Sequence, residues 1–156
     1  MKKETTYFYN ARIPSGWLQL TLGESGLVVT AAFVDQPEQG RSIPSKIKRA
    51  LDAYYKKGTA LPQTLYQFPT EGTEFMQSIW HAIAAVPLGE TITYTELAIA
   101  AGRPAAARAA GTACGKNPLA LFIPCHRVVR SSGEDFGYSW GTDRKRFLLT
   151  HEGVTF

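Results

Sequence analysis

At 156 residues the chain is long enough to bury a core, in one domain or in two small ones. Its content of 44% hydrophobic and 19% charged residues is that of a globular protein, and no apolar stretch approaches the roughly 18 residues of a membrane span. The basic N-terminal segment leads to no apolar signal-peptide core, and two cysteines are too few for a disulfide framework or a Cys-rich zinc site. We therefore expect a cytoplasmic protein with reduced thiols.

Basic residues are concentrated in one part of the chain, whose formal net charge is +4. Residues 97–133 contain no acidic residue but contain Arg103, Arg108, Lys116, Arg127 and Arg130. A stretch this basic suits a polyanion such as nucleic acid. Arginines that face water on an ordinary solvated surface give the same composition, so charge alone leaves both interpretations open.

The first half of the sequence predicts three strands followed by one helix. The strand-like segments are separated by turn signals and read YFYNARI (7–13), WLQLTLGES (17–25) and GLVVTAAFV (26–34). Pro44 and Ser45 then open an amphipathic helix that stops at Gly58. Residues 59–72 are rich in Pro, Thr and Gly, and this composition predicts a linker.

The second half predicts mainly helices. Thr73 is a helix cap followed by apolar residues at the spacing of one helix face, namely Phe75, Ile79, Ile83 and Val86. A short helix over about residues 95–101 breaks at Gly102, and Pro104 begins a second helix that runs to about Cys114. Two short helices across a glycine-containing turn are typical of a helix-turn-helix.

The second of these helices has a smooth surface. Most of residues 105–113 are Ala or Gly, and Arg108 is the only long polar side chain among them. Reading bases in the major groove requires several Arg, Asn or Gln side chains, so this helix suits close approach to the minor groove. An arginine that protrudes from such a face can hold a flipped nucleotide out of the base stack. The alternative is that the small residues only permit tight helix packing.

Cys125 and His126 lie side by side in the apolar run LFIPCHRVV. A free cysteine is commonly buried and inert, whereas a reactive one needs a base or a positive environment that favours the thiolate. Successive side chains in an extended segment point apart, so we expect a water, not a direct contact, to link this thiol with the histidine. Glu152, in LLTHEG, is an acid that can fold back and orient the other nitrogen of His126.

The string IPCHRVV, with Asn117 and Pro118 before it and LLTHEG after it, resembles the O6-alkylguanine-DNA alkyltransferases, or methylated-DNA–protein-cysteine methyltransferases. The resemblance extends over about residues 72–153, through TITYTELA, GRPAAARAAGTACGKNP and GYSWG. It implies an α+β fold with a variable, ribonuclease H-like αβ domain over residues 1–69. A mainly helical winged-helix or helix-turn-helix-like domain, which carries the DNA-binding and active-site residues, is implied over residues 70–156.

The resemblance also implies roles for single residues. Cys125 matches the acceptor of the alkyl group, His126 the water-linked base, and Glu152 the acid that orients this base. Tyr94 matches the tyrosine that contacts the flipped guanine and donates a proton as the base leaves. Asn117 matches the residue that ties the helix-turn-helix to the active-site loop.

Two further sets of residues follow from the resemblance. Arg108 matches the arginine that fills the space left by the flipped nucleotide, and further contacts to DNA are expected at Thr95, Arg103 and Ser131. The expected guanine pocket is formed at Val128, Tyr138, Ser139 and Trp140. Trp140 stands where many members of the family carry glycine, and its indole either crowds the entrance against bulky O6 adducts or stacks on them.

The implied activity is direct reversal of DNA damage. The sulfur of Cys125 takes a methyl or alkyl group from O6-alkylguanine, or from O4-methylthymine, and the thioether product is not hydrolysed by water, so the protein acts once. We expect a monomer that binds double-stranded DNA through the minor groove with base flipping, without a cofactor, a metal or a membrane. Cys114 lies in the Ala-rich helix and outside the PCHR motif, and we expect Cys114→Ser to retain transfer.

Three alternative functions are weaker. A non-enzymatic relative that only binds alkyl lesions shares the fold, but that class lacks the acceptor cysteine, and Cys125 is present. A thiol hydrolase based on Cys125 and His126 leaves the smooth helix and Arg108 without a role. A sequence-specific transcription factor requires base-reading side chains that the second helix lacks.

Overall fold

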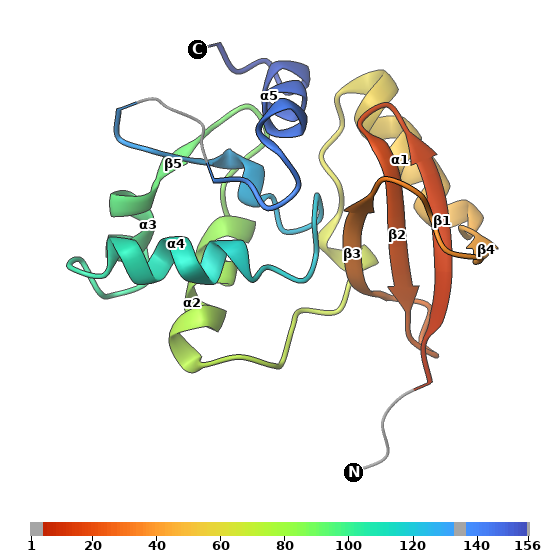
Figure 1. Cartoon of the computed structure of the whole chain (residues 1–156), viewed down its shortest axis with the longest axis horizontal. Helices are drawn as coiled ribbons and strands as arrows, with labels where there is room; N and C mark the ends of the chain where they lie inside the picture. The colour runs from red at the N-terminus through yellow and green to blue at the C-terminus, as the bar shows by residue number, and fades with distance from the viewer. Residues whose placement is uncertain (1–4, 133–136, 156) are drawn as a thin grey trace. The chain divides into compact units, whose positions relative to one another are not determined.

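The computed structural model describes residues 5–132 and 137–155, which form a mixed α+β fold (Figure 1). The chain divides into two units, each with its own core. The N-terminal unit comprises Met1–Phe68 and Pro118–Phe122, and the C-terminal unit comprises Pro69–Asn117 and Ile123–Phe156. This division falls next to the expected boundary after residue 69, but it also assigns a short later segment to the first unit.

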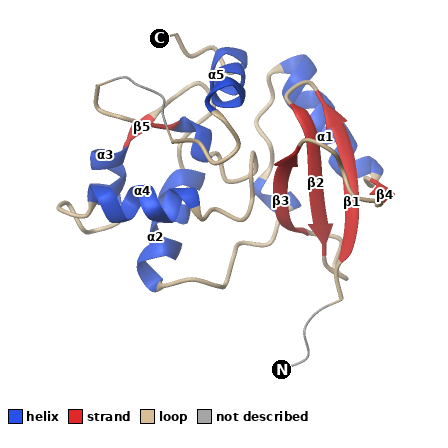
Figure 2. Cartoon of the chain, viewed as in Figure 1, coloured by secondary structure: helices blue, strands red, loops and turns tan. Residues whose placement is uncertain are grey.

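The sheet of the N-terminal unit has the strand order β3-β2-β1-β4 (Figure 2). The three predicted strands are confirmed as β1 (Tyr7–Ile13), β2 (Gly16–Leu22) and β3 (Val28–Val34), and they pair antiparallel. A fourth strand, β4 (Arg41–Ser42), pairs parallel to β1 and was not predicted. Two residues are too few to show the alternation by which a strand is recognised.

The core of this unit includes one face of β2 and one face of α1 (Ser45–Lys57). Successive side chains of a strand point to opposite faces, so every second residue of β2 is buried: Leu18, Leu20 and Leu22. The predicted helix is confirmed, and its buried residues recur at helical spacing: Ile47, Leu51 and Tyr54. Gly58 ends α1 in the left-handed conformation, with φ of 67°.

The predicted linker over residues 59–72 is wrong in its first part. Residues Gln63–Leu65 form the 3-10 turn η1, and Leu65 is buried. Tyr66 then forms a bridge with Val28, and the Gln67 amide donates to the Val28 carbonyl over 2.9 Å. Pairing with β3 thus holds this segment in the N-terminal unit despite its loop-like composition.

Residues 118–122 also pair with β3. The Ala31 amide donates to the Pro118 carbonyl, and the Ala120 amide donates to the Ala31 carbonyl, each over 2.9 Å. Leu121 has a φ of 73°, which a residue with a side chain rarely adopts. The chain therefore enters the N-terminal unit for five residues and re-enters the C-terminal unit just before Cys125.

Four helices form most of the C-terminal unit: α2 (Glu74–Ala84), α3 (Tyr94–Ala100), α4 (Ala107–Gly115) and α5 (Thr142–His151). The predicted cap of α2 is confirmed, because the Thr73 hydroxyl oxygen accepts from the Met76 amide over 3.1 Å. The indole of Trp80 on α2 donates to the Ala113 carbonyl on α4 over 3.0 Å. This buried hydrogen bond ties the two helices together.

The start of α4 differs from the prediction. The helix begins at Ala107 and not at Pro104, because Pro104 and Ala105 form a turn that the Ala106 amide closes on the Arg103 carbonyl over 2.9 Å. Ala106 stands at the cap position and has no side chain that can accept a hydrogen bond from the first turn. Proline marks the approach to the helix here, not its first residue.

A small parallel sheet joins two distant parts of the C-terminal unit. In it, β5 (Ile92–Thr93) pairs with β6 (Val128–Val129). Tyr94 directly follows β5, and the 3-10 turn η2 (Cys125–Arg127) directly precedes β6, so the pairing brings these residues into one region. None of the described helices is long and apolar enough to cross a membrane.

Candidate active site

The loop that carries Cys125 is closed at its base by a side-chain hydrogen bond. The Asn117 amide nitrogen donates to the Ile123 carbonyl over 2.8 Å. These two residues are the points where the chain leaves the C-terminal unit and re-enters it. The bond therefore fixes the start of the segment that leads through Pro124 to Cys125.

The expectation that Cys125 and His126 lie in an extended segment is wrong, because both are part of the 3-10 turn η2. Both residues are buried. The side chain of His126 nevertheless bonds with Glu152 and not with the neighbouring thiol. The water expected to link the thiol with the imidazole stays a prediction.

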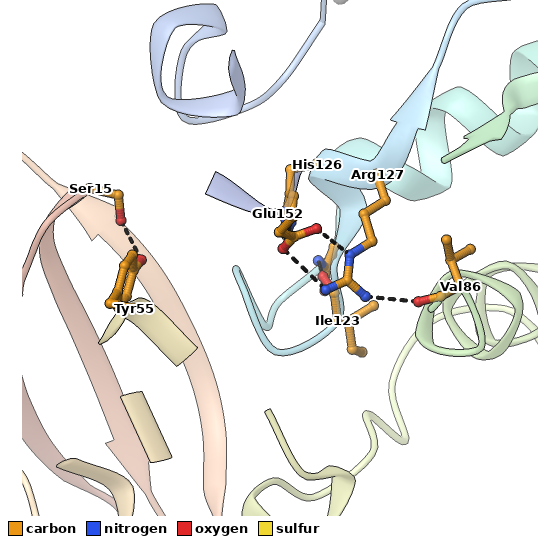
Figure 3. Close-up of polar contacts among 8 residues, drawn as sticks. Ser15, Tyr55, Val86, Ile123, His126, Arg127 and Glu152 are labelled. Carbon is orange, nitrogen blue, oxygen red and sulfur yellow. Dashed lines mark hydrogen bonds and ion pairs between the residues drawn. The ribbon is translucent and has the colours of Figure 1, made fainter. Parts of the chain in front are cut away.

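Glu152 joins His126 and Arg127 through one buried carboxylate (Figure 3). Its Oε2 lies 2.7 Å from Nε2 of His126, and its Oε1 accepts from Nε of Arg127, also over 2.7 Å. A second guanidinium nitrogen of Arg127 donates to Oε2 over 3.1 Å. The third donates to the Val86 carbonyl over 2.8 Å. The contact expected between Glu152 and His126 is present, and Arg127 compensates the buried negative charge.

His126 is held as a neutral base. Burial lowers the pKa of the imidazole below its ordinary value, although the neighbouring Glu152 opposes this shift. An ionised carboxylate only accepts hydrogen bonds, so the Glu152 contact places the ring hydrogen on Nε2 and leaves a lone pair on Nδ1. Nδ1 is buried and has no hydrogen-bond partner among residues 5–132 and 137–155. It is therefore the atom that can accept a proton.

Cys125 lines a small cavity in the C-terminal unit. Its lining residues come from α3, α4, α5, η2 and the segment before α5: Tyr94, Cys114, Gly115, Cys125, Gly137, Tyr138, Ser139 and Lys145. The Ser139 hydroxyl donates to the Gly115 carbonyl over 3.1 Å. The cavity thus collects the proposed acceptor, two of the expected pocket residues and the expected proton donor.

The other two expected pocket residues lie beside this cavity and do not line it. The indole of Trp140 packs edge to face on the ring of Tyr138, with centroids 5.3 Å apart. Val128 is buried in β6, and its carbonyl accepts from Nζ of Lys145 over 2.6 Å. Trp140 therefore acts on the pocket through its ring contact with Tyr138.

The surroundings of Cys125 favour its thiolate. A side-chain hydrogen bond with Cys114 is the largest cause that lowers the pKa of Cys125, against the opposing effect of burial. Hydrogen bonding by Asn117 and the positive charge of Lys145 lower this pKa further. The net shift is downward, as nucleophilic sulfur requires.

Tyr94 stays protonated beside this thiol. Burial raises the pKa of its hydroxyl to about 12, and the nearby Cys114 and Cys125 raise it too, while Arg130 acts in the opposite direction. A hydroxyl with this pKa keeps its hydrogen across the physiological pH range. Tyr94 can therefore act as a hydrogen-bond donor at the cavity.

The expected DNA contacts lie on the surface and not at the cavity. The side chains of Thr95, Arg103, Arg108 and Ser131 are all exposed. On α4, Ala109 and Thr112 are exposed with Arg108, so the outer face of this helix is smooth as predicted. The guanidinium of Arg103 stacks over the ring of Phe75, 5.0 Å from its centroid.

Three residues at the site were not predicted from sequence: Cys114, Arg127 and Lys145. Lys145 is only 1% exposed. In the sequence, Lys145 precedes Leu148 by three residues and Leu149 by four. This spacing places the charge on the apolar face of a helix. Across the described residues, no three His, Cys, Asp or Glu side chains gather where they could hold a metal ion.

A family model described as "6-O-methylguanine DNA methyltransferase, DNA binding domain" matches residues 74–154. The chain belongs to this family. A methylated-DNA–protein-cysteine methyltransferase of Methanosarcina acetivorans is 40% identical over 131 residues, which are 84% of this chain and 80% of the relative. The regulatory protein Ada of Salmonella typhimurium is 52% identical over 82 residues, 53% of this chain.

Solved structures of O6-methylguanine methyltransferases have the same fold. The Mycobacterium tuberculosis enzyme superposes with a TM-score of 0.82 at 33% identity, over 95% of this chain and 93% of that one. The same organism's OGT in complex with DNA gives a TM-score of 0.79 at 35% identity, over 93% and 91%. The chain spans only 23% of the Salmonella Ada protein and 64% of a methyltransferase from the same organism.

Removing the arginine that compensates Glu152 is expected to destabilise this methyltransferase-family chain. Arg127→Met leaves a buried carboxylate with its charge uncompensated, at a cost of about 3–5 kcal/mol in the free energy of unfolding. Lys116→Met, which removes an exposed charge, should change it by less than about 0.5 kcal/mol. Urea denaturation of both variants measures the difference, and Arg127→Met/Glu152→Gln should recover part of the loss. Equal stability of Arg127→Met and wild type would contradict this account of the ion pair.

Proposed function

We propose that this chain repairs alkylated double-stranded DNA by transferring a methyl or alkyl group from O6-alkylguanine to Cys125. The observation that carries the proposal is the position of Cys125: it lines a cavity with Tyr94, next to the His126–Glu152 pair, in a chain of the methyltransferase family. A cysteine with a lowered pKa and a tyrosine with a raised one supply a nucleophile and a proton donor.

In the proposed reaction, the Cys125 sulfur attacks the alkyl carbon. A carbon–sulfur bond forms as the carbon–oxygen bond breaks, and the electron pair of the broken bond stays on the guanine oxygen. Tyr94 donates a proton to the departing base, which makes it a better leaving group. His126 takes the thiol proton beforehand through a water at Nδ1, the nitrogen without a protein partner among the described residues. No cofactor is needed for this step.

The alkyl-bearing base reaches the cavity by flipping out of the duplex. We assign the DNA contacts to α3 and α4, which together have the order of a helix-turn-helix in the winged-helix-like domain, with Arg108 filling the vacated place in the base stack. The exposed small residues of α4 support close approach to the minor groove. Thr95, Arg103 and Ser131 are assigned to contacts beside Arg108. The crystallised Mycobacterium tuberculosis relative is itself described in complex with DNA.

Further assignments complete the proposal. The guanine pocket is formed by backbone groups near Val128 and Ser139, with Tyr138 as a wall and Trp140 behind it. O4-methylthymine is a second candidate substrate. The N-terminal unit is assigned a ribonuclease H-like architecture on its antiparallel β1–β3, its parallel β4 and α1. We further propose a monomer located in the cytoplasm.

Methyl transfer should stop at about one equivalent per active protein molecule, because the thioether formed on Cys125 has no route back to the thiol. The measurement is transfer of labelled methyl groups from duplex DNA containing O6-methylguanine. Cys125→Ser should abolish transfer, since a hydroxyl is much less nucleophilic than a thiolate, but it should still bind the DNA. Repeated turnover without an added reductant or exchange partner would exclude the mechanism.

His126→Ala and Glu152→Gln should each slow transfer about 100-fold, at the low end of what general-base catalysis contributes. Their pH profiles should shift toward alkaline values, because the thiol must lose its proton without the base. The double variant should lose less than the product of the two single effects, since both residues act on one proton path. Fully multiplicative effects would show two independent roles. Melting temperatures must be compared, because Glu152 also pairs with buried Arg127.

Arg108→Ala should slow repair of duplex DNA about tenfold or more, because flipping a nucleotide costs a few kcal/mol that the arginine helps to offset. Reaction with free O6-benzylguanine, if the wild type admits it past Trp140, should change much less. Lys116→Ala removes another exposed cation near the end of α4 and should weaken DNA binding in a salt-dependent way only. If Arg108→Ala slowed the reaction with the free base and with the duplex equally, Arg108 would be assigned to the pocket instead.

A further inference from the structure

The mechanism above makes no use of Cys114, the second buried cysteine of the chain. It lies near the end of α4, on the buried face that also carries Ala110 and Ala113. Its side chain lines the same cavity as Cys125, and its sulfur lies 4.0 Å from the Cys125 carbonyl oxygen. The two thiols also influence each other: the interaction between their side chains is the largest cause that raises the pKa of Cys114 and lowers that of Cys125.

Only one of these two thiols can ionise readily, because two negative charges that line the same small buried cavity repel each other. If the remaining proton is on Cys114, its S–H group has two possible acceptors of unequal strength: the carbonyl oxygen and the sulfur of Cys125. An anionic sulfur is a stronger acceptor than a neutral carbonyl, so an S–H group on Cys114 turns to the thiolate of Cys125. In the opposite arrangement Cys125 keeps the proton and the negative charge is on the sulfur of Cys114, farther from the residues that stabilise a thiolate.

Those favourable residues are positioned around Cys125. Hydrogen bonding by the Asn117 side chain and by the Cys125 backbone lowers the pKa of Cys125. Lys145 of α5 lines the cavity with both thiols. Of the remaining titratable groups, Tyr94 of α3 stays protonated and His126 of η2 points to Glu152. The pKa of Cys114 is raised well above its ordinary value, first by the bond to Cys125 and then by burial, in agreement with this division.

We propose that Cys114 is a positioning residue for alkyl transfer: it keeps its proton and donates an S–H hydrogen bond to the sulfur of Cys125, which holds the acceptor as a thiolate directed at the cavity. This inference rests on the proposed function of Cys125. Cys114 neither gains nor loses a proton in the reaction, since the carbon–sulfur bond forms on Cys125 and the departing base takes its proton from Tyr94. The role therefore requires a hydrogen-bond donor at this position and not a second nucleophile.

The test compares Cys114→Ala, which removes the donor, with Cys114→Ser, which keeps one. The pKa of Cys125 is measured from the pH dependence of its reaction with iodoacetamide, with the modified cysteine identified by mass spectrometry. Cys114→Ala should raise this pKa by about one unit, which lowers the thiolate fraction, and with it iodoacetamide reaction and methyl transfer at neutral pH, about tenfold. Both rates should recover at alkaline pH. Cys114→Ser should keep the wild-type profile.

An unchanged pH profile in Cys114→Ala would overturn the proposal, and so would the same alkaline shift in Cys114→Ser, which would assign the effect to packing of the sulfur. Cys125→Ser gives an independent measurement if Cys114→Ala does not fold. There the pKa of Cys114 should fall below its wild-type value, because the neighbouring thiolate is gone, and no fall would contradict the proposal. Wild-type protein that reacts with iodoacetamide as expected but takes no methyl group from DNA would refute the proposed function and leave the thiol pair standing.

Discussion

The site depends on the interaction of the buried Glu152 carboxylate with His126 and Arg127. A charge removed from water is tolerated only when it is paired and hydrogen-bonded, and Glu152 meets this condition through His126 and Arg127 together. Arg127 extends the network to the Val86 carbonyl, just after α2. Glu152 itself directly follows α5. One charge thus ties the end of the last helix, the turn that carries the acceptor and the segment after α2, so the orientation of His126 is part of what stabilises the C-terminal unit.

Elements with a strong local pattern could be predicted from sequence, and elements created by pairing could not. Each of the recognised patterns is local, because it involves residues only a few positions apart in the chain. These patterns are the alternation in β1–β3, the caps at Gly58 and Thr73 and the periodicity of α1. Residues 63–67 and 118–122 have loop composition, yet backbone hydrogen bonds to β3 give them a fixed place. Such pairing depends on a partner far away in sequence, so no local signal announces it.

The candidate site shows the same limit. The motif around Cys125 and the family resemblance pointed to His126, Glu152 and Tyr94, and the structure brings these residues into one region of the C-terminal unit. Cys114 and Lys145 lie on helices whose orientation decides whether they face the cavity or the solvent. Arg127 was counted in sequence as part of a basic stretch suited to DNA, yet it is buried against Glu152. A count of charges cannot separate a structural arginine from one that meets a phosphate.

The pKa values around the cavity are displaced in opposite directions, and each displacement suits a different step. Hydrogen bonding from Cys114 lowers the pKa of Cys125, whereas burial raises that of Tyr94 to about 12. Burial lowers the pKa of His126, so it starts the reaction as a base that is free of a proton at Nδ1. Displacements of this kind in neighbouring groups allow nucleophile, base and acid to coexist at one pH. The alkyl transfer proposed above uses all three groups: the thiolate of Cys125 attacks, His126 holds the thiol proton and Tyr94 protonates the departing base.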